Sequence, residues 1–189
     1  MCKCKNLSFV PNLISLSRII LTAVFAFYIL QKEINIAFVA FVIAAMTDFL
    51  DGRIARFLKV ESVFGSILDP LADKCLMITS YFVLGWLEVI PPILSAIVIF
   101  RDIAILFVVC LCKFLSIHLE FKPLFSSKLN TTIQLIYVII ILACWSFSID
   151  VPSVILYGCA LVVGASTIFS AVEYIRNYYW IKNAICTRK

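Results

Sequence analysis

The chain has 189 residues, of which 63% are hydrophobic and 14% are charged, and its mean hydropathy is +1.09. A soluble domain has roughly 25% charged residues, and this chain has too little polar sequence to cover an apolar core in water. The composition therefore excludes a soluble globular protein. It also excludes disordered and collagen-like chains, which need high charge or far more than the five glycines present.

Apolar runs long enough to cross a bilayer recur along the whole chain, since a span takes about 20 helical residues. The six predicted spans cover residues 12–30, 34–52, 67–86, 90–112, 130–148 and 151–175. The first run has no small-x-small cleavage site of a signal peptide, so we interpret it as a span. The sequence predicts an all-α integral membrane bundle of six transmembrane helices, in a single domain over residues 1–189.

Lysine and arginine fall almost entirely on one side of these spans. With the N-terminus inside, the outer connections carry Lys32 alone. Short basic loops stay in the cytoplasm, so both termini are expected there. The net charge of +5 then forms a basic inner face suited to anionic headgroups and phosphates. No nucleic acid partner is expected, because the basic residues are scattered and no known nucleic-acid-binding motif accompanies them.

The cysteine pattern indicates neither a disulfide scaffold nor a zinc site. The eight cysteines include no C-x-x-C pair, and His118 is the only histidine. Zinc sites need closely spaced cysteine and histidine ligands. We therefore interpret the cysteines as reduced or lipid-buried thiols.

Four aspartates lie toward the cytoplasmic ends of the second and third predicted spans: Asp48, Asp51, Asp69 and Asp73. The first two are spaced i, i+3 and the last two i, i+4, so each pair lies on one face of its helix. A turn near residues 58–62 would make these spans antiparallel and bring the pairs to similar depth. An aspartate at the centre of a membrane helix costs about 2.5–3.5 kcal/mol, and all-oxygen sites suit Mg²⁺ or Mn²⁺. The pattern predicts two divalent ions, an arrangement that can hold a diphosphate during an in-line displacement.

The carboxylates alone leave a second function open, because intramembrane carboxylates also serve ion or proton transport. The small residues Gly52, Ala55 and Gly65 would let a phosphorylated ligand approach the backbone. Close helix packing or a helix end explains Gly52 and Gly65 equally well when they are considered alone.

Taken together, these residues resemble the signature of the CDP-alcohol phosphatidyltransferase family. All eight fixed positions match over 26 residues. They are Asp48, Asp51, Gly52, Ala55, Arg56, Gly65, Asp69 and Asp73. The likeness extends through most of the chain, since members of the family also have six spans with the motif across the second and third. Two further features, Pro11-Asn12-Leu13-x3-Ser17-Arg18 and the polar start of the fifth span, resemble the branch that acts on glycerol-type acceptors. That branch contains phosphatidylglycerophosphate synthases and CMP-forming cardiolipin synthases.

The resemblance implies an enzyme that transfers a phosphatidyl group from CDP-diacylglycerol to a glycerol-type alcohol and releases CMP. The family's ligands for two Mg²⁺ or Mn²⁺ ions correspond to Asp48, Asp51, Asp69 and Asp73. Asp73 would also be the base that takes the proton of the acceptor hydroxyl. The family's CDP pocket corresponds to Gly52, Ala55, Arg56 and Gly65. The resemblance further implies a homodimer.

Polar residues inside other spans are candidates for binding the acceptor or its phosphate: Arg18, Arg101, Lys128 and Asn130. Arg18 has no anion beside it in sequence, which favours a phosphate over snorkelling to the interface. Asn130 could equally link helices. Arg101 and Asp102 could neutralise each other or face other partners in a cavity.

The choice of acceptor rests on two departures from phosphatidylglycerophosphate synthases. Phe100-Arg101-Asp102 replaces their usual Gly-Arg-Glu, and Asn130 stands where they tend to carry a second lysine. Both departures are similar to cardiolipin synthases. One cation fewer also suits phosphatidylglycerol, whose phosphodiester has one charge, whereas glycerol 3-phosphate has nearly two. Phosphatidylglycerol is the favoured acceptor and glycerol 3-phosphate is the alternative; amino-alcohol and inositol phosphate acceptors are less favoured.

Once the resemblance is considered, a transporter becomes the weaker alternative. A catalytically silent subunit is also disfavoured, because all four aspartates are present. The missing Arg- and Ser-rich transit segment favours a bacterial inner membrane, with the active site on the cytoplasmic side, over a mitochondrial inner membrane.

Overall fold

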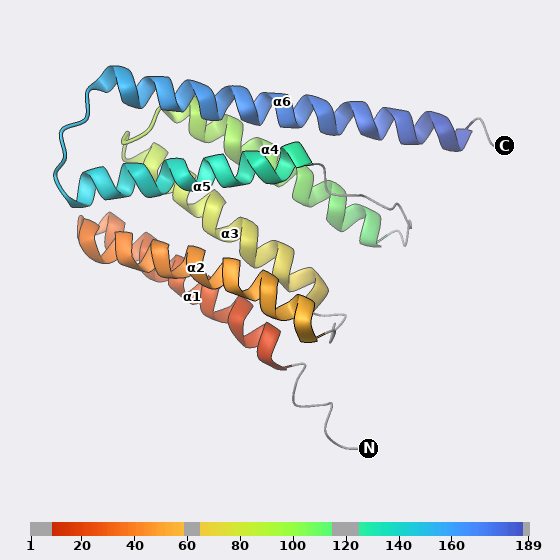
Figure 1. The fold of residues 1–189 in the computed structure, drawn as a ribbon, viewed down its shortest axis with the longest axis horizontal. Helices are drawn as coiled ribbons and strands as arrows, with labels where there is room; N and C mark the ends of the chain where they lie inside the picture. The colour runs from red at the N-terminus through yellow and green to blue at the C-terminus, as the bar shows by residue number, and fades with distance from the viewer. Residues whose placement is uncertain (1–8, 59–64, 115–124, 187–189) are drawn as a thin grey trace.

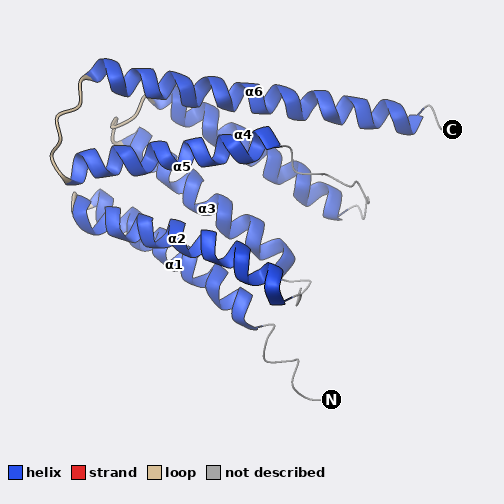
Figure 2. Ribbon diagram, in the orientation of Figure 1, coloured by secondary structure: helices blue, strands red, loops and turns tan. Residues whose placement is uncertain are grey.

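The computed structural model describes residues 9–58, 65–114 and 125–186, which form six α-helices and no strand (Figures 1 and 2). The helices are α1 (Phe9–Leu30), α2 (Ile34–Leu58), α3 (Gly65–Trp86), α4 (Pro92–Phe114), α5 (Phe125–Ser146) and α6 (Ser153–Cys186). The prediction of an all-helical protein is confirmed over these residues. The turn predicted near residues 58–62 lies outside the described residues, except for Leu58.

Consecutive helices run in opposite directions, so α1 begins and α6 ends at the same end of the bundle (Figure 1). α2 ends and α3 begins at that end too, which we call the motif end. The connections α1–α2, α3–α4 and α5–α6 lie at the other end. This up-and-down order brings the last turns of α2 and the first turns of α3 to one end of the bundle.

The three short connections end their helices in the same way. Lys32, Glu88 and Ser148 have φ angles of 63°, 56° and 53°. The next residue then donates its N–H to a carbonyl five residues earlier, as Glu33 does to Tyr28 at 3.0 Å. This Schellman-type cap satisfies carbonyls at the helix end that have no donor within the helix. Each cap reverses the chain with few connecting residues, which keeps neighbouring helices antiparallel.

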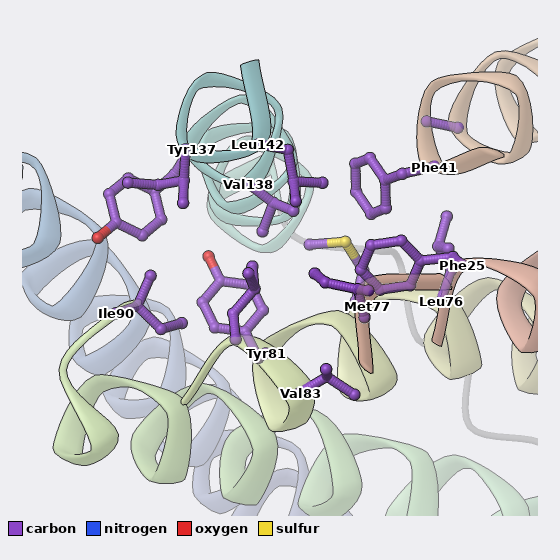
Figure 3. Close-up of a cluster of buried hydrophobic side chains, with 14 of the residues drawn as sticks. Phe25, Phe41, Leu76, Met77, Tyr81, Val83, Ile90, Tyr137, Val138 and Leu142 are labelled. Atoms are coloured by element: carbon purple, nitrogen blue, oxygen red, sulfur yellow. The ribbon is translucent and has the colours of Figure 1, made fainter. Parts of the chain in front are cut away.

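The core is built of buried aromatic and aliphatic side chains from all six helices. Figure 3 shows part of it. The rings of Phe25 and Phe41 join α1 to α2, with their centroids 5.4 Å apart. Tyr81 of α3 is fully buried, and its hydroxyl donates to the backbone carbonyl of Gln134 on α5 at 3.2 Å. This hydrogen bond offsets the free-energy cost of burying the Tyr81 hydroxyl. The contact fixes α3 against α5.

The outward faces of the helices are apolar as well. Trp86, Phe100, Val154 and Leu161 each expose more than 70% of their surface. Within the described residues, two stretches are long and apolar enough to cross a membrane, Ser126–Ser146 and Ser153–Tyr174. Large exposed apolar surface on such helices indicates association with a membrane. That all six helices span it, and that both termini are cytoplasmic, stay predictions.

Candidate active site

The predicted motif lies on the two helix segments that meet the motif end of the bundle. Asp48, Asp51, Gly52, Ala55 and Arg56 belong to the second half of α2. Gly65 begins α3, and Asp69 and Asp73 follow within its first turns. Both pairs of aspartates therefore have the helical spacing that the sequence predicts. The side chains of all eight residues lie outside those that the structure describes, so their proposed roles stay predictions.

Helix α1 packs against both α2 and α3 and so holds the two motif-bearing helices in one unit. Arg18, a candidate for binding the acceptor, lies on α1 and is only 4% exposed. Its backbone carbonyl accepts a hydrogen bond from the Thr22 hydroxyl at 2.8 Å. The role of Arg18 in binding the acceptor or its phosphate stays a prediction.

Lys74 follows Asp73 directly on α3, and its side chain is described. Its Nζ donates to Oδ1 of Asp102 on α4 at 3.3 Å. The same oxygen accepts from Nη1 of Arg101 at 2.7 Å. Asp102 is completely buried, and the side chains of Lys74 and Arg101 are 15% and 4% exposed. A buried carboxylate is stable only when it is paired, and here two cations share one of its oxygens.

Hydroxyl groups from two further helices hold the Arg101 guanidinium. Its Nη2 donates to the Ser127 hydroxyl of α5 at 2.9 Å and to the Ser170 hydroxyl of α6 at 2.7 Å. The sequence left open whether Arg101 and Asp102 neutralise each other or face other partners, and it did not indicate Ser127, Ser170 or Lys74 as partners of this pair. We call the resulting group the charged cluster: Lys74, Arg101, Asp102, Ser127 and Ser170. It joins α3, α4, α5 and α6.

A second, uncharged group of polar side chains links α5 to α6. Oδ1 of Asn130 accepts from the Ser166 hydroxyl at 2.8 Å, and the Thr167 hydroxyl lies 3.2 Å from the same oxygen. Nε2 of Gln134 donates to the Thr167 hydroxyl at 3.0 Å. Asn130 is 1% exposed and thus links helices, one of the two roles left open by the sequence. Its acceptor role stays a prediction.

The four acceptor candidates do not form one described site. Arg101 and Asn130 lie in the interior between α4, α5 and α6, whereas Arg18 lies on α1. Lys128, near the start of α5, is exposed. The side chains that the structure describes include no group of three His, Cys, Asp or Glu residues close enough to hold a metal ion.

The protein is a membrane-associated helical bundle, as its fold and its apolar outer faces show. It carries the aspartate motif at one end. Residues 8–174 match the family model described as CDP-alcohol phosphatidyltransferase, and the chain belongs to this family. The resemblance drawn from the motif is confirmed.

Curated relatives carry the two names of the predicted branch. The chain is 34% identical over 185 residues to a cardiolipin synthase (CMP-forming) of Rattus norvegicus, with 88% of this chain and 61% of the relative covered. The corresponding human enzyme is 32% identical, with coverages of 88% and 62%. A CDP-diacylglycerol--glycerol-3-phosphate 3-phosphatidyltransferase 1, chloroplastic, of Oryza sativa subsp. japonica is 31% identical, with coverages of 91% and 57%. The chain thus spans about three fifths of the length of these relatives.

Proposed function

We propose that the chain is a divalent-metal-dependent phosphatidyltransferase that moves the phosphatidyl group of CDP-diacylglycerol to a glycerol-type alcohol and releases CMP. One observation carries the proposal. The complete eight-residue motif lies on α2 and α3, whose motif-bearing segments share one end of the bundle (Figure 1), in a chain that belongs to the CDP-alcohol phosphatidyltransferase family. Family membership indicates the chemistry, and the motif supplies the groups that this chemistry needs.

The donor set fits two Mg²⁺ or Mn²⁺ ions. Their ligands would be Asp48, Asp51, Asp69 and Asp73. Carboxylate oxygens are the ligands that these hard cations prefer, whereas zinc sites usually use nitrogen and sulfur. When bound, the ions would stabilise the negative charge that develops on the diphosphate.

The remaining motif residues have roles in binding and proton transfer. Asp73 would take the proton of the acceptor hydroxyl as its oxygen attacks the phosphorus that bears diacylglycerol. The bond from that phosphorus to the bridging oxygen breaks, and CMP leaves with the bond's electrons. Arg56 would bind a phosphate oxygen pair as a bidentate donor. Gly52, Ala55 and Gly65 would let the nucleotide approach the backbone.

Phosphatidylglycerol is the acceptor that we favour, which would make the product cardiolipin. The Arg101 guanidinium already contacts one carboxylate and two hydroxyl groups within the protein. Because these partners already balance part of the Arg101 charge, less positive charge is left for an acceptor. This suits phosphatidylglycerol, which has one phosphodiester charge, better than glycerol 3-phosphate, which has nearly two. Relatives named for both reactions match the chain, so glycerol 3-phosphate is the second candidate.

The test is an assay of CMP release by the purified protein. CDP-diacylglycerol and Mg²⁺ or Mn²⁺ are supplied with phosphatidylglycerol in one reaction and glycerol 3-phosphate in another, and the lipid product is identified. We expect CMP release with phosphatidylglycerol and the appearance of cardiolipin. If folded protein releases no CMP with any alcohol acceptor, the enzyme assignment is wrong. An ion or proton transporter would instead show flux into liposomes without CDP-lipid.

We propose that the protein lies in a membrane with the motif end facing the cytoplasm, and that it functions as a homodimer. The apolar outer surface supports a membrane location. The basic residues of the inner segments support the orientation. The proposed dimer rests on the family resemblance.

A further inference from the structure

We propose that Asp102 is a positioning residue for the reaction, acting through Lys74 to fix the part of α3 that carries Asp73. This inference rests on the proposed function, because Asp73 is assigned there as the base. It goes beyond that function, since neither Lys74 nor Asp102 belongs to the eight-residue motif.

The first step of the argument is the burial of Asp102. The carboxylate is fully buried on α4, and its Oδ1 accepts from both Lys74 and Arg101. Its other oxygen, Oδ2, is buried and has no hydrogen-bond partner in the part of the chain that the structure describes. A carboxylate in this position is costly without its two cations, so the Lys74 ammonium is strongly attracted to this place on α4.

The second step is the rigidity of the anchor. Arg101 is held on three sides, by Asp102 on its own helix, by Ser127 of α5 and by Ser170 of α6. Helix α4 also packs against α3 and α6. Lys74 is thus attached to a framework of three helices, whereas a flexible surface partner would leave it mobile.

The third step connects Lys74 to the site. Neighbouring residues of an α-helix point about 100° apart around its axis, so an attachment at Lys74 fixes the rotation of α3 at position 73 as well. Catalysis depends on such placement, because a shift of about 1 Å in a reacting group can slow a reaction about 100-fold. The cluster would therefore act on the rate of the chemical step and leave nucleotide affinity largely unchanged.

A purely structural ion pair makes a different prediction. It would lower thermal stability when broken, but the protein that remained folded would turn over at the normal rate. Separate measurements of kcat and KM on folded protein therefore distinguish the two roles: positioning predicts a lower kcat at nearly unchanged KM, and a structural ion pair predicts a normal kcat.

The experiment uses the full chain in detergent or vesicles and compares Asp102→Asn, Asp102→Glu, Lys74→Met and the Lys74→Met/Asp102→Asn double variant. Asp150→Asn is the matched control, because Asp150 is an exposed carboxylate at the other end of the bundle. CMP release gives kcat and the KM for CDP-diacylglycerol, and CMP affinity and melting temperature are measured in parallel.

We expect Asp102→Asn and Lys74→Met each to lower kcat by about tenfold or more, with KM and CMP affinity within about twofold of the wild type. The double variant should be no slower than the slower single variant, because both changes break one connection. Asp102→Glu should restore part of kcat. Asp150→Asn should match the wild type.

Two results would overturn the inference while leaving the proposed function intact. One is a normal kcat in folded Lys74→Met and folded Asp102→Asn. The other is a multiplicative loss of kcat in the double variant, which would mean that the two residues act independently. A wild-type protein that releases no CMP would instead overturn the proposed function, and this inference with it.

Discussion

Gly85 of α3 packs directly against Ser95 of α4. A Cβ atom on Gly85 would lie 2.7 Å from Cβ of Ser95 and closer still to its Oγ. Nonbonded carbon atoms do not approach this closely. The helices α3 and α4 can therefore pack this closely here only because Gly85 has no side chain. The same two helices carry the ion pair between Lys74 and Asp102.

Replacing Gly85 with alanine should therefore force α3 and α4 apart. We expect Gly85→Ala to lower the free energy of unfolding by about 1–3 kcal/mol, the usual range for overpacking. Gly158→Ala on α6 is the control, because a Cβ there would meet nothing within 4 Å. The control should be neutral or slightly stabilising, since alanine favours a helix by up to about 1 kcal/mol. Equal unfolding curves for the two variants in detergent would contradict the packing argument.

Thr167 tests the uncharged polar group between α5 and α6. Its side chain is fully buried, and Thr167→Val would leave the amide of Gln134 without this acceptor. We expect a loss of about 0.6–2 kcal/mol in unfolding free energy, from values for hydrogen bonds in membrane and soluble proteins. Thr132→Val is the control, because Thr132 is exposed and its hydroxyl bonds only the Lys128 carbonyl of its own helix. A control variant as unstable as Thr167→Val would count against the linking role.

The caps at Lys32, Glu88 and Ser148 allow a direct test of membrane topology. All three residues are exposed at the end of the bundle opposite the motif (Figure 1). In a cysteine-free background, single cysteines at these positions should all react with a membrane-impermeant maleimide added on the side of the membrane opposite the cytoplasm. Cysteines placed at the termini should react only after the membrane is opened. Reaction of one cap position from the cytoplasmic side would contradict six alternating spans.

The proposed base is tested by Asp73→Asn. An amide cannot take the acceptor's proton, so we expect CMP release to fall by at least about 100-fold, within the range for losing a general base. CMP binding should change little. Asp150→Asn serves again as a control for loss of a carboxylate, and it should keep full activity. Normal turnover in folded Asp73→Asn would remove the base role from this residue.

The order of the helices could be predicted because each apolar run is long, but several helix bounds could not. The second predicted span stops at residue 52, whereas α2 continues to Leu58. The last stops at residue 175, whereas α6 continues to Cys186. Hydropathy detects only the part of a helix that lies in lipid, and a helix needs only its own backbone hydrogen bonds to continue past it.

The motif could be found from the sequence because its spacing is local, within two helices. The charged cluster could not, apart from the adjacent Arg101 and Asp102. Lys74 lies 28 residues from Asp102, and Ser170 lies 69 residues from Arg101. A single serine inside an apolar helix has no distinguishing pattern, and its partner depends on how distant helices pack. Such contacts appear only once the bundle is assembled.

The most direct test of the metal-dependent account is anomalous X-ray diffraction from crystals grown with Mn²⁺ and CDP. The account predicts manganese peaks between α2 and α3 at the motif end, within coordination distance of the four motif aspartates. An Asp69→Asn variant should lose one or both peaks. Aspartates that point apart, or manganese bound only elsewhere at a concentration that supports CMP release, would contradict it.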